Sequence, residues 1–458
     1  MLRLIPIIAM SLLSAAASAA PLPEPRAALL TRQLQAIVDD PALPLPGLSV
    51  VAIRHGEIAY RHQFGSKRLA TASSPAQPID ENTMFRVASV SKFVTALGAM
   101  KLVEQGRLSL DADISDYLGY RLRNPHFPDQ AITLRMLLTH TSSLRDEGGF
   151  KWGPGVDLKE VLLPGGRHYG KGAMWSAERA PGGWFEYVNF NWGLVATVME
   201  AASGERFDRL MRRLLFDPMA LKAGFYLADF APAMLGDVAT LYRKREKDGA
   251  ETWDATGPWV AQADDFGNET PAAPPGLDRY KAGSNGTIFG PQGSLRISTG
   301  ELAQIMLMLV NGGRQGDKQI LAPQTVATMF SRQWTLHDGG ADGSKNGSAN
   351  GDGGSFRGLY HAWGLGNQQF TDTSIVKDGR ASGDRLVEGG GFTGVGHLGW
   401  SWGLNALFVF DPRTKDGMIY VSSGVGANPD LQPGKFSSEA RFQERITDAL
   451  YRGAIAQP

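Results

Sequence analysis

Strand-forming segments occur at both ends of this chain, and helical segments fill the middle. Near the N-terminus, residues 48–53 and 57–64 are β-type runs with a tight turn at His55-Gly56 between them. Near the C-terminus, residues 406–410 and 418–422 flank a turn at Asp411-Pro412. Such short connections join antiparallel strands, because parallel strands need a longer crossover. We therefore expect an α+β fold, in which N- and C-terminal strands form one antiparallel sheet flanked by helices.

Helical periodicity predicts what covers this sheet and what interrupts it. Apolar residues recur at helical spacing in residues 26–38, 93–103, 192–202, 207–215, 302–310, 323–330 and 439–454. The first and last of these helices should cover the sheet, and a mostly helical subdomain should be inserted at about residues 93–310. We expect one domain over residues 20–458. Two irregular segments, 229–292 and 338–358, are expected to be a surface lobe and a mobile loop.

The first residues have the pattern of a secretory signal peptide. Arg3 precedes an apolar run at 4–13, and Ala17-Ser18-Ala19 forms a small-x-small cleavage site. Residues 1–19 are therefore expected to be removed, which predicts a periplasmic or secreted protein. Since no cysteine stands at the cut, we expect no lipid anchor and no stable membrane attachment after cleavage. A buried N-terminal helix is the alternative.

Composition excludes several kinds of chemistry. The chain has no cysteine, which excludes disulfides, thiolate metal sites and a cysteine nucleophile. Lysine plus arginine equals aspartate plus glutamate at 46 each, and no basic excess indicates nucleic-acid binding. No cofactor motif or metal-ligand set stands out. The polar string 342–347 resembles a calcium loop, but the position that needs a glutamate is Gly353. The oligomeric state is not predicted.

Ser89 and Lys92 have the spacing of a nucleophile and its base. Ser89 opens the helix expected at 93–103, and Lys92 lies one turn on along the same face. The surrounding residues are mostly apolar, and burial can lower the pKa of a lysine by several units. A second Ser-x-x-Lys, Ser374 to Lys377, lies in a polar string without such surroundings. Chance occurrence remains the alternative reading for the motif alone.

Tyr187-Val188-Asn189 is the only Tyr-x-Asn in the chain. Beside a cationic Lys92, the phenolate of Tyr187 should be favoured, which would suit a proton relay. The amide of Asn189 can orient a substrate carbonyl. The alternative reading is a buried tyrosine followed by a turn asparagine.

His397-Leu398-Gly399 precedes Trp400 and the strand expected at 406–410. Gly399 permits close backbone approach, and the Trp400 N–H is expected to be an oxyanion donor opposite the Ser89 N–H. His397 is expected to donate a hydrogen bond or a proton to the leaving group. Five tryptophans near these motifs suggest either an aromatic-walled pocket or core packing: Trp175, Trp184, Trp192, Trp400 and Trp402.

As a set, these motifs resemble the serine β-lactamase, penicillin-binding protein and esterase superfamily, in its class C β-lactamase-like branch. The similar stretches are residues 85–92, 137–144, 181–191 and 396–412, within a resemblance covering roughly 30–450. The resemblance implies an acyl-enzyme on Ser89, proton transfer by Lys92 and Tyr187, and an antiparallel sheet beside a helical domain. His140 lies in a string typical of the family, and we interpret it as structural.

One departure from the family bears on the substrate. The third motif of these β-lactamases is Lys-Thr-Gly, whereas His397 and Leu398 stand at its first two positions here. A substrate carboxylate would lose charge-assisted hydrogen bonds of about 1.5–3 kcal/mol each. The leading hypothesis is therefore a secreted serine hydrolase acting on a small ester, amide or peptide. The alternatives are a D-alanyl-D-alanine peptidase or β-lactamase, and a non-catalytic module that binds peptidoglycan peptides.

Overall fold

The computed structural model describes residues 21–245, 252–266, 269–339, 344–350 and 357–456. The expected signal peptide at 1–19 lies outside the described residues, as does part of the segment 338–358.

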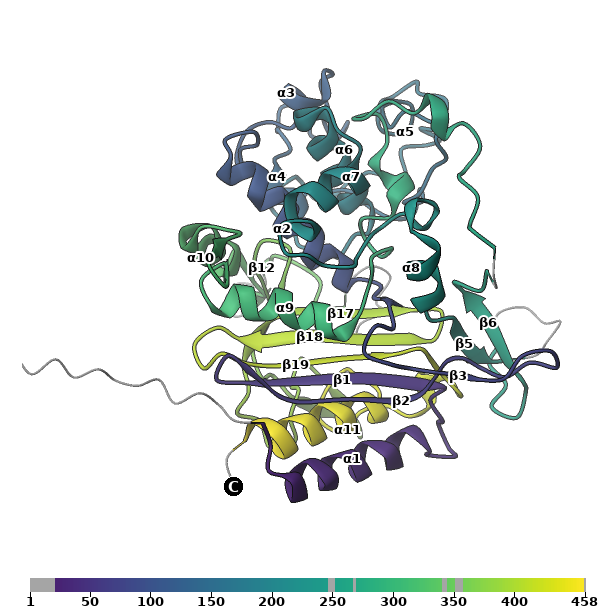
Figure 1. Cartoon of the computed structure of the whole chain (residues 1–458). Coiled ribbons are helices and arrows are strands. Elements are labelled where there is room, and N and C mark those ends of the chain that lie inside the picture. Colours follow the sequence, from purple (N-terminus) through teal and green to yellow (C-terminus); the bar gives the residue numbers. More distant parts are fainter. Residues whose placement is uncertain (1–20, 246–251, 267–268, 340–343, 351–356, 457–458) are drawn as a thin grey trace, which may run out of the picture.

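Strands from both ends of the chain form the central antiparallel sheet (Figure 1). β1 (Gly47–Arg54) pairs with β2 (Glu57–Arg68) on one side and with β19 (Asp416–Ser422) on the other. β18 (Leu404–Asp411) then joins β19 to β17 (Gly394–Ser401). This arrangement confirms the fold class predicted from the sequence.

Within the described residues the sheet has nine strands, in the order β10-β13-β14-β17-β18-β19-β1-β2-β3. The strands not yet introduced are β3 (Gln77–Pro78), β10 (Trp334–Thr335), β13 (Ala362–Trp363) and β14 (Gln368–Phe370). The sequence did not predict these four strands.

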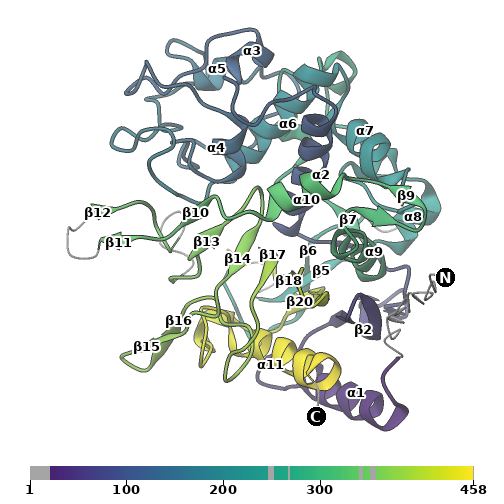
Figure 2. The ribbon, with the colours of Figure 1, turned by 90° about the vertical axis from the view of Figure 1, so that its left-hand side faces the viewer.

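Helices cover both faces of the sheet. α1 (Glu24–Val38) and α11 (Arg441–Leu450) lie together on one face, while α9 (Thr299–Val310) and α2 (Val90–Glu104) lie on the other (Figures 1 and 2). Side chains alternate along each strand between two hydrophobic cores. In β18, Leu407 belongs to the core under α1 and α11, whereas Phe408 packs against Phe93 of α2 at 5.0 Å between ring centroids.

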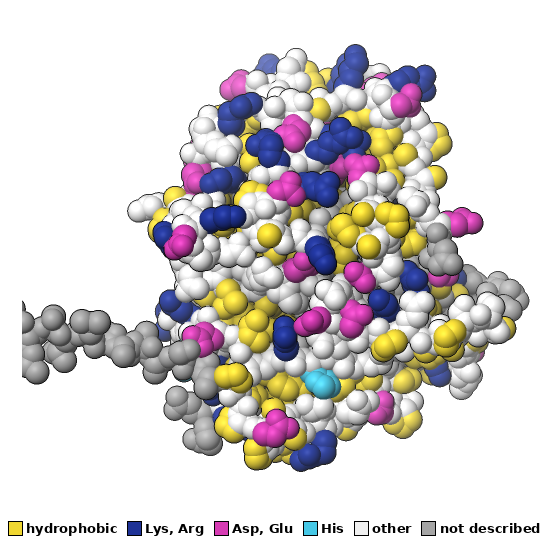
Figure 3. All heavy atoms as spheres, in the orientation of Figure 1, with side chains coloured by type: hydrophobic (Ala, Val, Ile, Leu, Met, Phe, Trp, Pro, Cys, Tyr) yellow, Lys and Arg dark blue, Asp and Glu magenta, His cyan; other side chains and the backbone are white. Residues whose placement is uncertain are grey.

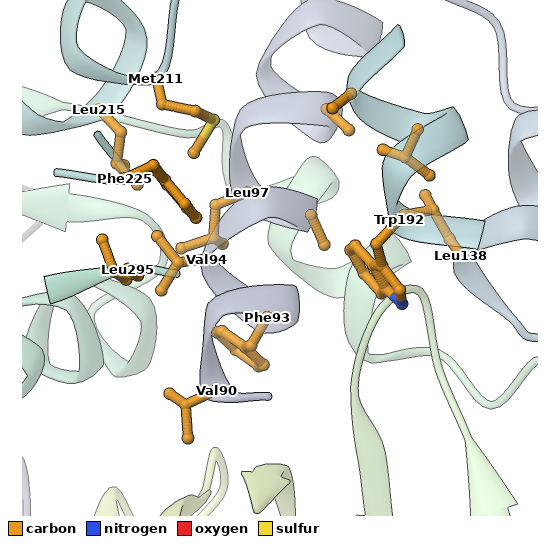
Figure 4. Close-up of a cluster of buried hydrophobic side chains, with 14 of the residues drawn as sticks. Val90, Phe93, Val94, Leu97, Leu138, Trp192, Met211, Leu215, Phe225 and Leu295 are labelled. Atoms are coloured by element: carbon orange, nitrogen blue, oxygen red, sulfur yellow. The ribbon is translucent and has the colours of Figure 1, made fainter. Parts of the chain in front are cut away.

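The helical subdomain is built around α2. α4 (Leu134–Leu138), α6 (Phe190–Ser203) and α7 (Phe207–Met211) pack near it, and Figure 4 shows apolar side chains surrounding it on several sides. Twelve residues of α2 are buried. A helix that is apolar on all sides belongs to an interior, and the polar side chains among these twelve residues, those of Ser91, Lys92 and Thr95, are withdrawn from water.

The remaining α-helices and strands are short. They are α3 (Ser115–Leu118), α5 (Lys159–Leu162), α8 (Pro232–Asp237), α10 (Pro323–Phe330), β4 (Phe85–Arg86), β5 (Leu241–Lys244), β6 (Trp259–Ala263), β7 (Arg296–Ile297), β8 (Arg314–Gln315), β9 (Lys318–Gln319), β11 (Asp338–Gly339), β12 (Ser344–Lys345), β15 (Ile375–Lys377), β16 (Arg380–Ser382) and β20 (Gly424–Val425). The helix expected at 323–330 is thus present with those bounds.

The two segments expected to be irregular both contact other parts of the fold. In the first, the Asp264 carboxylate is buried between the guanidinium groups of Arg86, at 3.0 Å, and Arg296, at 2.6 Å. In the second, β11 pairs with β12, and the Phe185 N–H donates to Asn346 O at 2.9 Å. The expected roles of these segments as a surface lobe and a mobile loop stay predictions.

The surface has no dominant sign of charge on the face that Figure 3 shows. Lysine and arginine side chains are interspersed there with aspartate and glutamate. Across the described ranges, every helix is too short or too polar to cross a membrane.

Candidate active site

Ser89 lies at the entry to α2, directly after β4, which pairs with β7. The preceding residue, Ala88, has a φ of 43°, a left-handed conformation that side chains other than glycine rarely adopt. Such backbone strain is retained where the surrounding structure enforces it, often at functional sites. Ser89 is the N-cap residue of α2 and lies at the positive end of its dipole.

The Lys92 amine contacts Ser89 directly. Its Nζ lies 2.9 Å from Ser89 Oγ, 2.8 Å from Asn189 Oδ1 and 3.0 Å from Gln292 O. The side chain is completely buried, and this burial lowers its pKa to about 7, although the nearby Asp146 carboxylate raises it. A lysine with this pKa is partly neutral at physiological pH, and it can accept a proton from a hydroxyl within reach.

Tyr187 completes the group that the sequence predicted would meet. Its buried side chain lies beside that of Ser89, which lowers its pKa, and Lys92 Nζ lies 5.0 Å from the ring centroid. Burial raises the pKa of Tyr187 above its ordinary value, and this effect outweighs the lowering by the nearby Ser89 side chain. The prediction that its phenolate is favoured was wrong, because withdrawal from water disfavours the anion more than nearby groups stabilise it.

Asp146 holds Asn189 in place. Its Oδ2 accepts hydrogen bonds from the backbone N of Asn189 at 2.8 Å and from Nδ2 at 2.9 Å. Its Oδ1 accepts from Phe190 N at 2.9 Å, in the first turn of α6. With Nδ2 held by Asp146, the carbonyl of the Asn189 amide is directed to Lys92. Asn189 thus orients the lysine, rather than serving only the substrate as the sequence predicted.

His140 braces the segment that carries Tyr187. Its Nδ1 accepts a hydrogen bond from Val188 N at 3.0 Å, and its ring stacks on that of Tyr187 at 4.5 Å between centroids. Burial lowers the pKa of His140 well below its ordinary value, so the imidazole is neutral. These contacts agree with the structural role interpreted from the sequence.

Gly399 lies where β17 meets the start of α2. A methyl group at this position would be 2.6 Å from Val87 O and 3.3 Å from Ser89 N. No real side chain tolerates the first contact, so glycine is required for the strand to approach the Ser89 backbone this closely. Only residues 394–396 of β17 pair with β14, which leaves the strand past Gly396 uncovered by that neighbour.

Trp400 presents its backbone and its side chain to different sides. β17 and β18 are joined by the two-residue turn Trp402-Gly403, and Ser401 opposes Leu404. Hydrogen-bonded pairs alternate along such a ladder, so the Trp400 N–H is directed away from β18. The indole packs with the core under α1 and α11, on the face opposite to Gly399. The geometry thus suits the backbone N–H, and not the indole, as the expected oxyanion donor.

His397 is a neutral hydrogen-bond acceptor. Its Nδ1 lies 2.6 Å from Leu398 O and must carry the proton, which leaves a lone pair on Nε2. Nε2 is buried and has no hydrogen-bond partner among the described residues. Burial, reinforced by the nearby Lys92, lowers the pKa of His397 to about 3. The prediction that His397 donates a proton was therefore wrong, because no charged form is available above that pH.

The other motifs of the same kind lie elsewhere. Ser374 and Lys377 lie at an exposed two-stranded hairpin, β15–β16, where Ile375 is 52% exposed. Of the five tryptophans, Trp175 and Trp192 are buried in the core. The described His, Asp and Glu side chains form no group of three that could hold a metal ion.

Sequence reasoning missed Asp146 and Gln292. Neither belongs to a recognisable motif, and their contacts with Asn189 and Lys92 span 43 and 200 residues of sequence. The only available signal for Asp146 is its position just after the string 137–144.

Comparisons with known proteins agree with this arrangement. A family model described as Beta-lactamase matches residues 32–437. Esterase EstB from Burkholderia gladioli is 31% identical over 218 residues, which is 44% of this chain and 53% of that protein. Penicillin-binding protein 4* from Bacillus subtilis is 30% identical over 181 residues, 38% of this chain and 36% of that protein. The chain thus spans about half or less of the length of these two curated relatives.

Solved structures show the same fold. The D-alanine carboxypeptidase AmpC from Burkholderia cenocepacia superposes with a TM-score of 0.59, covering 94% of this chain and 98% of that one at 18% identity. Since the family model extends over most of the sequence and includes all the clustered side chains, the resemblance noted in the sequence is confirmed: the chain belongs to the Beta-lactamase family.

Proposed function

We propose that this protein is a serine hydrolase that cleaves an ester or amide bond through an acyl-enzyme on Ser89. The observation that carries the proposal is the pairing of Ser89 Oγ with Lys92 Nζ at 2.9 Å, in a site where burial lowers the lysine pKa to about 7. A serine hydroxyl is a weak nucleophile until a base within reach accepts its proton, and Lys92 satisfies both the distance and the pKa.

The acceptors around Lys92 fit the charge that it would gain. When the neutral amine takes the Ser89 proton, it becomes an ammonium group with three N–H donors. Three oxygens surround it, from Ser89, Asn189 and Gln292, and the Asp146 carboxylate also favours its charged form. The ammonium is therefore stabilised as the serine oxygen attacks the carbonyl carbon. The Ser89 and Trp400 N–H groups would hold the resulting oxyanion.

Tyr187 would pass the proton onward. Its protonated phenol, which lies beside Ser89, can donate its proton to the departing alcohol or amine and take one from Lys92. Collapse of the tetrahedral intermediate then breaks the bond to the leaving group and leaves Ser89 acylated. Water would release the acid by the same transfers in reverse, which restores the hydroxyl and the neutral amine.

A neutral ester is the substrate class that the site favours. At the position where the related β-lactamases carry a lysine, this chain has an uncharged His397 whose Nε2 accepts hydrogen bonds. A substrate N–H or O–H would satisfy that buried lone pair, whereas a carboxylate would be repelled by it. The esterase among the relatives supports this preference. Other relatives are named as a putative D-alanyl-D-alanine carboxypeptidase and a D-aminopeptidase. We therefore propose small peptides as a further substrate class.

Labelling tests the nucleophile directly. A fluorophosphonate probe should label the wild-type protein and Ser374→Ala, which removes the other motif serine, but not Ser89→Ala. Hydrolysis of p-nitrophenyl acetate should show a burst of nitrophenol, the sign of an accumulating acyl-enzyme. Equal labelling of all three proteins would reject Ser89. Complete absence of labelling and hydrolysis in the wild type would favour the non-catalytic peptide-binding module.

A substrate panel tests the class. We expect turnover of p-nitrophenyl acetate to exceed that of the β-lactam nitrocefin and of D-alanyl-D-alanine peptides. Comparable nitrocefin turnover would instead place the protein with the β-lactamases. The N-terminal pattern at residues 1–19 supports export of this hydrolase, and sequencing the N-terminus of the protein recovered from its native cells tests that part.

A further inference from the structure

The ring of Tyr187 is stacked between two other aromatic rings. The His140 imidazole lies 4.5 Å from it between centroids, with the ring planes 25° apart, and the Tyr360 phenol lies 5.1 Å from it at 8°. One face of a phenol ring has room for one stacked ring, so these two neighbours occupy opposite faces. Movement of the Tyr187 ring along its normal is therefore blocked in both directions.

Trp363 blocks sideways movement of the same ring. Its indole is nearly perpendicular to all three stacked rings, at 75° to Tyr187, 79° to Tyr360 and 80° to His140. The distances between centroids are 5.9, 5.5 and 5.1 Å in the same order. The indole is completely buried, and its Nε1–H donates to Leu138 O at 3.1 Å. The residue that closes the edge of the stack is thus itself fixed to α4.

Tyr360 is anchored independently of Tyr187. Its side chain is buried, and its backbone N–H donates to Ala349 O at 3.0 Å. Its ring also contacts that of Phe185, two residues before Tyr187, at 5.7 Å between centroids. Tyr360 therefore has supports of its own, which allow it to impose a position on Tyr187.

The position of the Tyr187 hydroxyl matters because a proton donor acts only within hydrogen-bond reach of its acceptor. The hydroxyl is at the far end of the ring, so a rotation about the Cα–Cβ bond displaces it more than any other heavy atom of the side chain. Burial raises the pKa of Tyr187, so the phenol keeps its proton until an acceptor develops charge beside it. Such a donor is effective only if its ring is held in place.

We propose that Tyr360 is a positioning residue, whose ring holds the Tyr187 hydroxyl where it donates a proton to a basic leaving group. This inference rests on the proposed function. As the tetrahedral intermediate collapses, the oxyanion reforms the carbonyl, the bond from carbon to the leaving oxygen or nitrogen breaks, and the Tyr187 proton passes to that atom. The phenolate then takes the proton that Lys92 received from Ser89. An alkoxide needs this donated proton, whereas p-nitrophenolate is stable enough to leave without it.

Two acetates of similar size separate proton donation from the other steps. p-Nitrobenzyl acetate releases a basic alcohol, whereas p-nitrophenyl acetate releases an acidic phenol, and both deliver the same acetyl group to Ser89. The ratio of their kcat/KM values is measured in each variant. Since both esters meet the same sample, this ratio does not depend on the fraction of the protein that is folded, and destabilised variants remain informative.

Tyr360→Leu removes the stacked ring, whereas Tyr360→Phe keeps the ring and removes the hydroxyl. We expect Tyr360→Leu to lower kcat/KM for p-nitrobenzyl acetate at least about tenfold more than for p-nitrophenyl acetate, because general acid catalysis contributes about 10²–10⁴-fold. Tyr360→Phe should keep the wild-type ratio. Tyr360→Met fills the space without a ring and should behave like Tyr360→Leu, which provides a second variant if leucine prevents folding.

Tyr451→Leu is the matched control. It removes a tyrosine ring that packs on Phe392 at 5.6 Å between centroids, close to the C-terminal end of the chain. This variant loses a comparable aromatic contact away from Tyr187, so its ratio should equal that of the wild type. A ratio shifted as far in Tyr451→Leu as in Tyr360→Leu would overturn the specific role of Tyr360.

Tyr187→Phe distinguishes failure of this inference from failure of the proposed function. It should lower kcat/KM for p-nitrobenzyl acetate at least about 100-fold more than for p-nitrophenyl acetate. Adding Tyr360→Leu to it should not change the ratio further, because no hydroxyl is left to position. An unchanged ratio in Tyr187→Phe would refute proton donation by Tyr187 itself. A changed ratio there, with a wild-type ratio in Tyr360→Leu or equal changes in Tyr360→Leu and Tyr360→Phe, would overturn the role of the Tyr360 ring and leave the proposed function intact.

Discussion

The Asp146 carboxylate accepts hydrogen bonds from the backbone N–H and the side-chain N–H of Asn189, at 2.8 and 2.9 Å. Because this carboxylate binds the amide nitrogen, the Asn189 carbonyl faces Lys92 at 2.8 Å. The same carboxylate raises the pKa of the lysine against the lowering effect of burial. Asp146 therefore acts on the candidate base in two ways, by orienting its partner and by its charge.

Replacing Asp146 with asparagine should separate these effects in a pH profile. Neutral Lys92 is the active form, so kcat/KM for p-nitrophenyl acetate should rise with pH through an apparent pKa of about 7. Removal of the nearby negative charge favours the neutral amine, so the rise in Asp146→Asn should move to lower pH. Loss of an ideal acceptor for Asn189 should also lower kcat by about tenfold, or about 1.4 kcal/mol.

Asp157→Asn is the matched control, because Asp157 pairs with the surface residue Lys159 at 3.4 Å. Its profile should coincide with that of the wild type. A rise that stays in place or moves to higher pH in Asp146→Asn would contradict the electrostatic role.

Lys92→Met should stabilise the protein more at pH 6 than at pH 9. The pKa of Lys92 is about 7 in the folded protein and 10.5 ordinarily, and burial is the main cause. Below pH 7 the amine is charged in both states, and the folded state bears the full cost of burying it. Between pH 7 and 10.5 only the unfolded chain keeps the proton, so stability rises with pH. Methionine removes this dependence.

The increase in the free energy of unfolding caused by Lys92→Met should be about 2–3 kcal/mol larger at pH 6 than at pH 9, because the dependence extends over the two pH units between 7 and 9. Denaturant unfolding at both pH values measures it. Lys377→Met on the exposed β15–β16 hairpin is the control and should change stability equally at both. An equal gain at pH 6 and 9 for Lys92→Met would mean that the folded protein binds the proton as tightly as the unfolded chain.

Much of the sheet could be predicted because its strands are specified locally. β1, β18 and β19 are long and rich in apolar residues, and short turns join β1 to β2 and β18 to β19, so these strands carry local signals. β14 is three residues long and has the polar sequence Gln368-Gln369-Phe370. Such a strand is defined by its pairing with β13 and β17 and is not detected by a search for local patterns.

The candidate site also contains features that the local sequence predicts and features that it does not. Ser89 and Lys92 were predictable because helix geometry alone brings residues three apart together. The predicted protonation states of Tyr187 and His397 were wrong, because they depend on surroundings that the local sequence does not show. Tyr187 is withdrawn from water more than it is stabilised by charge, and the His397 proton is fixed by the carbonyl of its own neighbour, Leu398.

Gly399→Ala should inactivate the protein without unfolding it. The added methyl group would meet Val87 O at 2.6 Å and Ser89 N at 3.3 Å, so β17 and the Ser89 segment must move apart. Loss of one oxyanion donor typically lowers turnover by about 10²–10³, and we expect kcat for p-nitrophenyl acetate to fall in that range. Gly236→Ala, in α8 with open space around it, should keep full activity. Activity of Gly399→Ala within about twofold of the wild type would exclude this close approach from catalysis.

Because His397 is neutral, replacing it should change substrate recognition and leave the pH dependence of kcat/KM unchanged. Burial lowers its pKa to about 3, so its charge does not change between pH 5 and 9, and the rise of kcat/KM near pH 7 should persist in His397→Leu and His397→Gln. What should change is the recognition of a substrate donor by the Nε2 lone pair. The p-nitrophenyl ester of N-acetylglycine has an amide N–H, whereas p-nitrophenyl acetate has none.

We expect His397→Leu to lower kcat/KM for the N-acetylglycine ester by about tenfold relative to the acetate, the loss of one hydrogen bond of about 1–1.5 kcal/mol. Glutamine offers a carbonyl acceptor at the same position, so His397→Gln should recover much of that loss. If both variants lost the pH-dependent rise, His397 rather than Lys92 would be the group that titrates. A loss shared equally by the two esters would assign His397 to packing against Tyr187 and Trp363, whose ring centroids lie 6.1 and 5.6 Å from its own.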